Sequence, residues 1–163
     1  MNQTAHKVAI ITGGSQGIGA SLVTAYRRQG WSVVATARAM KPAEDPDVLT
    51  AGGDLAGPAT ADRIIGGALG RFGRIDTLIN NAGVYISKPF TDYTAGDYAL
   101  VAGVNLTGFF WLTQRAIAEM LHRHGGHPVT RHRVRLPRHP GQRRLAGHHP
   151  DAGAPGGQLP GTR

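Results

Sequence analysis

The sequence contains no cysteine, and only 6% of its 163 residues are aromatic. Without cysteine, neither a disulfide framework nor a thiolate metal site can form. No stretch approaches the ~20 apolar residues that a membrane span needs, and the N-terminal apolar run Val8–Ile11 is too short for the core of a signal peptide. These absences predict a cytoplasmic protein without membrane association and, at this length, one domain at most.

Residues 127–163 contain no serine, tyrosine or lysine. They carry seven arginines against one acid, a net charge of +6 within a chain total of +8. Low hydrophobicity combined with high net charge is typical of disorder. A basic run can also bind nucleic acid, but this one has no aromatic side chains to stack on bases. We therefore expect a disordered, basic Pro/Arg/His/Gly-rich tail over residues 127–163 that binds no specific nucleic acid.

Histidines near and within this tail suggest a metal site at first sight. No cysteine and almost no acid accompanies them, so a closed set of ligands is missing. We expect no metal site. The histidines concerned are His122, His124, His132, His139, His148 and His149.

Residues 1–126 show a different pattern, in which short apolar runs alternate with helical periodicity. We predict strands over residues 7–12, 32–37, 48–50 and 75–80, and helices over residues 17–29, 58–72, 91 or 94 to 101, and 105–122. Strands that alternate with helices indicate βαβ units and a parallel sheet. The predicted fold class is therefore α/β, a Rossmann-type doubly wound parallel sheet truncated after the fourth strand and its following helix.

A glycine-rich turn joins the first predicted strand to the first predicted helix. Thr12 and Gly13 are followed by Gly17 and Gly19, a Thr-Gly-x-x-x-Gly-x-Gly spacing. Gly13 would allow a tight turn, Gly17 would let the backbone approach a pyrophosphate, and Gly19 would let the helix pack close to the strand. The free N–H groups and the dipole of the helix N-terminus favour a phosphate there.

This spacing resembles that of the short-chain dehydrogenase/reductase family, and three later features fit the family in order. Asp54-Leu55 stands where the family places an acid beside adenine. Asn80-Asn81-Ala82-Gly83 matches the family's turn after the fourth strand, and Asn105 matches its catalytic asparagine. The resemblance covers about residues 5–126 and implies a partial NAD(P)-binding Rossmann domain over residues 1–126. The cofactor-binding residues that it implies are Gly13, Ser15, Gln16, Gly17, Ile18, Gly19, Arg38, Asp54, Leu55, Asn81, Ala82 and Gly83.

The end of the second predicted strand bears on which nicotinamide dinucleotide binds. An acid there would bind the ribose hydroxyls of NAD, whereas an arginine accommodates the extra phosphate of NADP. This chain has Ala37 where the acid would stand, followed by Arg38. We expect NADP(H) in preference to NAD(H), although Gln16 in the glycine turn adds no cation. The alternative is that Arg38 is only a solvated surface charge.

The resemblance implies hydride transfer between nicotinamide and a carbonyl or alcohol substrate, for which the family uses a serine and a Tyr-x-x-x-Lys pair beside Asn105. The lysine is needed because an unperturbed tyrosine, with a pKa of about 10, is a poor base near neutrality. These residues should follow Gly126, but the chain has no serine beyond Ser87 and no tyrosine with lysine four residues later. We therefore expect an oxidoreductase by descent that is inactive as it stands. The tyrosines, all upstream of Asn105, are Tyr26, Tyr85, Tyr93 and Tyr98.

A frameshift near codons 126–130 is our hypothesis for the missing residues, because the tail has the Arg, Pro, His, Gly and Ala enrichment of a GC-rich gene read out of frame. Reading the coding DNA in the other two frames tests this; if neither yields a serine followed by Tyr-x-x-x-Lys, the hypothesis is wrong. The alternative is a non-catalytic dinucleotide-binding module, or a partner subunit with a basic tail.

The predicted truncation also leaves apolar surface uncovered. The fourth strand, Ile75–Ile79, would become an edge of the sheet. Phe109, Phe110 and Trp111 would lie exposed on the helix that the family uses in its homo-oligomer interface. The alternative is that they pack in the core, as part of this apolar stripe must. We expect that interface to be incomplete and the chain to be marginally stable and prone to aggregation.

Overall fold

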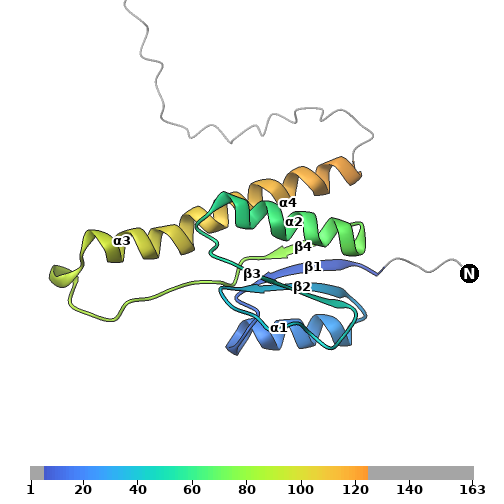
Figure 1. Ribbon diagram of the computed structural model, residues 1–163, viewed down its shortest axis with the longest axis horizontal. Helices are drawn as coiled ribbons and strands as arrows, with labels where there is room; N and C mark the ends of the chain where they lie inside the picture. The colour runs from blue at the N-terminus through green and yellow to red at the C-terminus, as the bar shows by residue number, and fades with distance from the viewer. Residues whose placement is uncertain (1–5, 125–163) are drawn as a thin grey trace, which may run out of the picture. The chain divides into compact units, whose positions relative to one another are not determined.

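A computed structural model describes residues 6–124 of the chain. The predictions about the tail, the boundary at residues 126–127 and most of the histidines lie outside the described residues. Within them, four parallel strands form one sheet in the order β3-β2-β1-β4 (Figure 1). The strands are β1 (Val8–Thr12), β2 (Ser32–Ala37), β3 (Val48–Gly52) and β4 (Thr77–Ile79).

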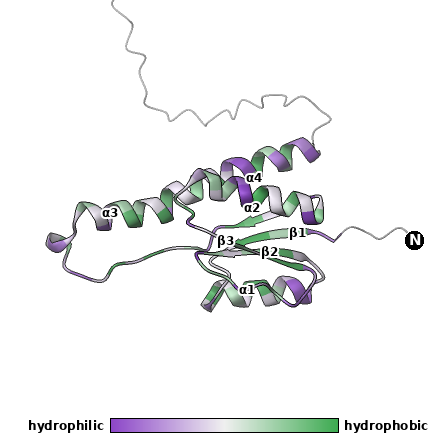
Figure 2. Ribbon diagram, viewed as in Figure 1, coloured by the Kyte–Doolittle hydropathy of each residue, from purple (hydrophilic) through white to green (hydrophobic). Residues whose placement is uncertain are grey.

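Helices cover both faces of this sheet. The helix α1 (Gly17–Arg28) packs on one face, and α2 (Pro58–Phe72) and α4 (Phe109–His124) pack on the other (Figure 1). Strands buried on both faces are apolar nearly throughout instead of alternating, and β1 and β2 have this character (Figure 2). The predicted doubly wound α/β fold is confirmed.

Two helices begin where the sequence predicts. Pro58 opens α2, where its missing N–H would have had no helical partner, and Gly73 ends it with a left-handed φ of 70°. The helix α1 begins at Gly17, and its Leu22, Val23 and Tyr26 pack on the sheet. Ile18, in the first turn of the same helix, is 74% exposed.

Both helices predicted after residue 91 are present, but they form one continuous helical segment. The helix α3 (Ala95–Ala102), a π-helical turn η2 (Gly103–Gly108) and α4 follow one another without a break (Figure 1). Thr94 caps α3 in a reciprocal pair of hydrogen bonds with Asp97, and a short 3₁₀ turn η1 (Phe90–Asp92) precedes it. A π turn closes its hydrogen bonds one residue later than an α-helix, so it interrupts the helical periodicity without ending the helix.

The strand β4 is shorter than the predicted strand over residues 75–80. The pairing nevertheless starts earlier, because the Asp76 N–H donates to the Val8 carbonyl at 2.9 Å. The Asp76 carboxylate also accepts from the Val8 N–H at 2.8 Å and from Arg74. Burial opposes the ionisation of Asp76, but these hydrogen bonds outweigh it and lower its pKa.

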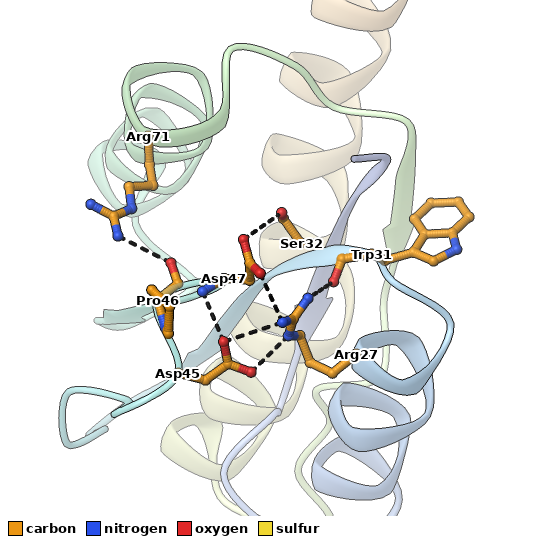
Figure 3. A network of polar contacts seen from close by, with 7 residues as sticks. All are labelled: Arg27, Trp31, Ser32, Asp45, Pro46, Asp47 and Arg71. Carbon is orange, nitrogen blue, oxygen red and sulfur yellow. Dashed lines mark hydrogen bonds and ion pairs between the residues drawn. The ribbon is translucent and has the colours of Figure 1, made fainter. Parts of the chain in front are cut away.

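Arg27, in the last turn of α1, anchors the connection between β2 and β3 (Figure 3). Its guanidinium donates to both carboxylate oxygens of Asp45, at 2.8 and 3.2 Å, and to Asp47 at 2.9 Å. A fourth bond reaches the Trp31 carbonyl at 2.5 Å. Hydrogen bonding to Asp45 raises the pKa of Arg27, and the same contact lowers the pKa of Asp45. The connection is thereby fixed where it enters β3.

Within the described residues, β4 lies at one end of the sheet. Phe109 and Phe110 are about half exposed, as predicted. Trp111 follows the alternative of core packing, because this side chain is partly buried against the cluster under α2 and α4. No helix in the described part of the chain is long and apolar enough to cross a membrane.

Candidate functional site

A cavity of about 570 Å³ opens at the carboxyl ends of β1, β2 and β4. The direction of sheet growth reverses between β1 and β4, and parallel α/β sheets bind ligands at such switch points. Ten of the twelve predicted cofactor-binding residues line this cavity, so segments far apart in the sequence meet there. The lining residues are Gly13, Ser15, Gln16, Gly17, Ile18, Gly19, Ala37, Arg38, Ala39, Asn81, Ala82, Gly83 and Val84.

The glycine turn needs its glycines for separate physical reasons. Gly13 and Gly17 have φ angles of +69° and +55°, which side chains disfavour. A Cβ on Gly19 would lie 2.0 Å from the Gly13 carbonyl oxygen, so the start of α1 can contact β1 only without one. A Cβ on Gly17 would meet no atom within 4 Å, because this backbone faces open space. The tight turn expected at Gly13 and the close packing expected at Gly19 agree with this geometry, and the pyrophosphate contact expected at Gly17 stays a prediction.

The first turn of α1 presents donors to the cavity. The N-cap residue Gln16 makes no side-chain cap, and the first turn contains no acid. The first N–H groups of a helix have no partner within the helix, and the dipole gives this end a partial positive charge. Ser15 and Gln16 are exposed beside them, and the exposed Ile18 adds an apolar surface. An anionic group with an attached ring would find complementary chemistry here.

Thr12 and Asn81 tie the glycine turn to the segment that follows β4. The Thr12 hydroxyl oxygen accepts from the N–H groups of Asn81 and Ala82, both at 2.9 Å. The Asn81 side-chain amide donates to the Thr12 carbonyl at 3.0 Å. Because Thr12 is 2% exposed, these bonds are shielded from water and hold two cavity walls in a fixed relation.

Asn105 lies in the π turn η2 and binds the next part of the wall. Its side-chain oxygen accepts from the Val84 N–H at 2.9 Å, and its amide donates to the Val84 carbonyl at 3.0 Å. Asn105 does not itself line the cavity, whereas Val84 does. The predicted catalytic asparagine therefore contacts the site through the backbone of Val84.

Comparison with known proteins identifies the chain's relatives. The family model described as short chain dehydrogenase matches residues 7–130. The chain belongs to the short-chain dehydrogenase family. An uncharacterized oxidoreductase of Methylorubrum extorquens is 32% identical over 126 residues, which are 71% of this chain and 51% of that protein. An Arabidopsis thaliana 11-beta-hydroxysteroid dehydrogenase-like protein is 34% identical, over 70% of this chain and 42% of that protein.

Solved short-chain dehydrogenase structures share the fold. The crystal structure of a Brucella melitensis 3-ketoacyl-(acyl-carrier-protein) reductase complexed with NADH has a TM-score of 0.68 and 27% identity, covering 72% of this chain and 51% of that one. A Serratia marcescens short-chain dehydrogenase/reductase has a TM-score of 0.62 and 33% identity, and the match covers 69% of this chain and 52% of that one. The chain thus spans about half the length of the short-chain dehydrogenases it matches.

Two predicted cofactor-binding residues do not line the cavity at the glycine turn. Asp54 is exposed, and its carboxylate accepts from the Ala56 N–H at 3.0 Å. Leu55 is only 9% exposed and belongs to the apolar core under α2 and α4. Leu55 also lies against Gly108 of η2, where an added Cβ would lie 2.8 Å from the Leu55 Cβ.

Sequence reasoning named neither Ala39 nor Val84 among the residues that line the cavity. Both directly follow predicted site residues, and that adjacency was the one available signal. Lys88, three residues after Tyr85, is paired with Asp97 at 2.5 Å. The bond from Lys88 holds the pKa of Asp97 well below its usual range. Within residues 6–124, no three His, Asp or Glu side chains gather closely enough to hold a metal ion.

Proposed function

We propose that this chain binds a nicotinamide dinucleotide in the cavity at the glycine turn. It would be the cofactor-binding part of an oxidoreductase that transfers hydride between NAD(P)(H) and a carbonyl or alcohol. The observation that carries the proposal is that the glycine turn, the end of β2 and the Asn81–Val84 segment meet in one cavity. Family membership supports the same conclusion.

The residues present fit such a cofactor. The open space beside Gly17 leaves room for a pyrophosphate to approach the backbone, and the start of α1 would supply N–H donors and a favourable dipole. Ile18 would offer its exposed side chain to an apolar ring face. When bound, the dinucleotide supplies the hydride chemistry. The residues of this chain would bind it, orient it and shield part of it from water.

The proposal favours NADP(H) over NAD(H). Arg38 lines the cavity at the end of β2, is exposed, and makes no ion pair within residues 6–124. Its charge is therefore available to a phosphate on the adenosine ribose. Position 37 carries alanine instead of an acid, so no carboxylate there would repel that phosphate. We expect the Arg38→Ala variant to bind NADPH about 10-fold or more weakly while its affinity for NADH changes less than threefold, since an arginine–phosphate contact contributes about 1.5–3 kcal/mol. Equal losses for the two cofactors would contradict the preference.

The proposal assigns no turnover to the 163-residue sequence alone. Of the four residues that the family resemblance implies for catalysis, the sequence carries only Asn105. A carbonyl substrate would meet no tyrosine acid and no lysine to lower the pKa of one. The same absence favours the second candidate, a non-catalytic dinucleotide-binding module. An incomplete homo-oligomer interface and a cytoplasmic location remain predictions from the sequence.

Purified chain with NADPH and a panel of simple ketones tests this directly. The expected result is saturable binding of NADPH without its oxidation. Oxidation at a rate proportional to added protein, retained after a second purification step, would refute the inactivity. If the folded chain does not bind NADPH, the dinucleotide site itself is refuted.

A further inference from the structure

The π turn η2 lies directly on the connection that follows β3. Gly108 is buried, and an added Cβ there would lie 2.8 Å from the Leu55 Cβ and 3.0 Å from the Leu55 carbonyl oxygen. At Gly103, the other end of the turn, an added Cβ would lie 3.2 Å from the Ala56 Cβ. These neighbours are backbone atoms and first side-chain atoms, which cannot rotate away. Both ends of the turn are therefore seated on Leu55 and Ala56 because they lack side chains.

The same turn holds the cavity wall through Asn105. The two hydrogen bonds between Asn105 and the Val84 backbone, at 2.9 and 3.0 Å, fix a residue that lines the cavity. Gly83 is also close, since a Cβ there would lie 3.6 Å from the Asn105 side-chain oxygen. Asn105 stands between Gly103 and Gly108, so its position depends on how closely the turn sits on Leu55 and Ala56.

We propose that Gly103 and Gly108 are positioning residues for Asn105. By letting the π turn sit on the Leu55–Ala56 connection, they bring the Asn105 side chain to the Val84 backbone and so set the wall of the cavity. A side chain at Gly108 would lift the turn from Leu55 and pull Asn105 away from Val84. The consequence for cofactor binding rests on the proposed function, whereas the consequence for Val84 does not.

Three glycine-to-alanine variants of the full chain form a graded test. Gly66 in α2 has no atom within 4 Å of an added Cβ, so Gly66→Ala is the matched control for a helical substitution. Gly103→Ala is the mild perturbation, since its Cβ would lie 3.2 Å from the Ala56 Cβ. Gly108→Ala is the severe one, since its Cβ would lie 2.8 Å from the Leu55 Cβ. The measurement is hydrogen exchange of the Val84 amide, with the buried Ile10 amide as a report on global opening.

Relative to Ile10, we expect Val84 exchange to be unchanged in Gly66→Ala, a few-fold faster in Gly103→Ala, and about 10-fold or more faster in Gly108→Ala. Asn105→Ala removes the bond itself and should match the severe variant. If Val84 keeps its wild-type protection in Gly103→Ala and Gly108→Ala, or if Gly66→Ala exposes it equally, the proposal is overturned. Should Gly108→Ala fail to fold, the comparison of Gly103→Ala with Gly66→Ala decides the matter alone.

A binding measurement separates positioning from a general loss of structure. Under the proposed function NADPH would extend along the whole cavity, whereas adenosine 2′,5′-bisphosphate carries only the adenosine end. We expect Gly103→Ala and Asn105→Ala to weaken the binding of NADPH at least threefold more than the binding of the bisphosphate. Equal weakening of both ligands would contradict a positioning role. If the wild-type chain binds neither ligand, the proposed function fails, and the exchange series still tests the positioning of Asn105.

Discussion

Replacing Gly19 by alanine places a methyl group where the structure has no room for one. The added Cβ would lie 2.0 Å from the Gly13 carbonyl oxygen and 2.7 Å from the Asn81 side-chain nitrogen. The carbonyl belongs to the backbone of the glycine turn and cannot rotate aside. The methyl group must therefore push α1 away from β1 and strain the hydrogen bonds of Asn81. Since overpacking in a tight core costs about 1–3 kcal/mol and sometimes more, we expect Gly19→Ala to lower the free energy of unfolding by about 3 kcal/mol.

Gly17→Ala is the informative comparison, because the two glycines stand two residues apart in the same turn. An alanine at Gly17 would touch no protein atom within 4 Å, but its φ of +55° is strained for a side chain, at a cost of about 1–2 kcal/mol. Its methyl group would point into the open space that the proposed function assigns to a pyrophosphate. Gly17→Ala should thus fold and lose NADPH binding at least tenfold, whereas Gly19→Ala should lose stability first.

Urea unfolding followed by circular dichroism gives the stabilities, and NADPH fluorescence gives the binding. Gly70→Ala in α2, where an added Cβ meets nothing within 4 Å, is the control and should gain about 0.4–1 kcal/mol. The reasoning is refuted if the free energy of unfolding of Gly19→Ala differs from that of the parent by less than ~0.5 kcal/mol, which is the scale of neutral surface changes. It is equally refuted if Gly17→Ala binds NADPH unchanged.

Two further predictions concern ionic contacts that hold the sheet connections. Arg27→Lys keeps the charge but loses the bidentate contact with Asp45, so it should lower the free energy of unfolding by about 1 kcal/mol in urea; an unchanged midpoint would argue that the network in Figure 3 is dispensable. The pKa of Asp76 is lower in the folded chain than in the unfolded chain, where it is about 4. The ionised carboxylate therefore contributes fully to the free energy of unfolding above pH ~4, and this contribution is lost as the pH falls through the folded pKa. Asp76→Asn should therefore flatten the loss of thermal stability below pH ~4, and a parent and variant with parallel acid profiles would contradict this.

The sequence was sufficient to predict the fold wherever a local pattern coincided with a burial pattern. The strand at residues 32–37 and the helix at residues 58–72 have the predicted bounds, because an apolar run and a Pro58 start are local signals. The glycine turn was equally readable, since its spacing reflects close contacts within one turn.

The parts that could not be predicted depend on contacts between distant segments. The π turn is seated on Leu55 by Gly108, and a 3.6-residue periodicity cannot reveal that contact. The sequence left open whether Trp111 is exposed or packed, because the described cluster that buries part of it includes residues of α2. The side chain of Asn105 reaches Val84 across 21 residues of sequence, which no pattern in either segment indicates.

Isothermal titration of the full chain with NADPH is the most direct test of the account. We predict one saturable site per chain that adenosine 2′,5′-bisphosphate competes for and that Gly17→Ala weakens at least tenfold. A titration without saturable heat, from a chain that circular dichroism shows to be folded, would contradict the claim that the glycine turn and its neighbours form a dinucleotide site.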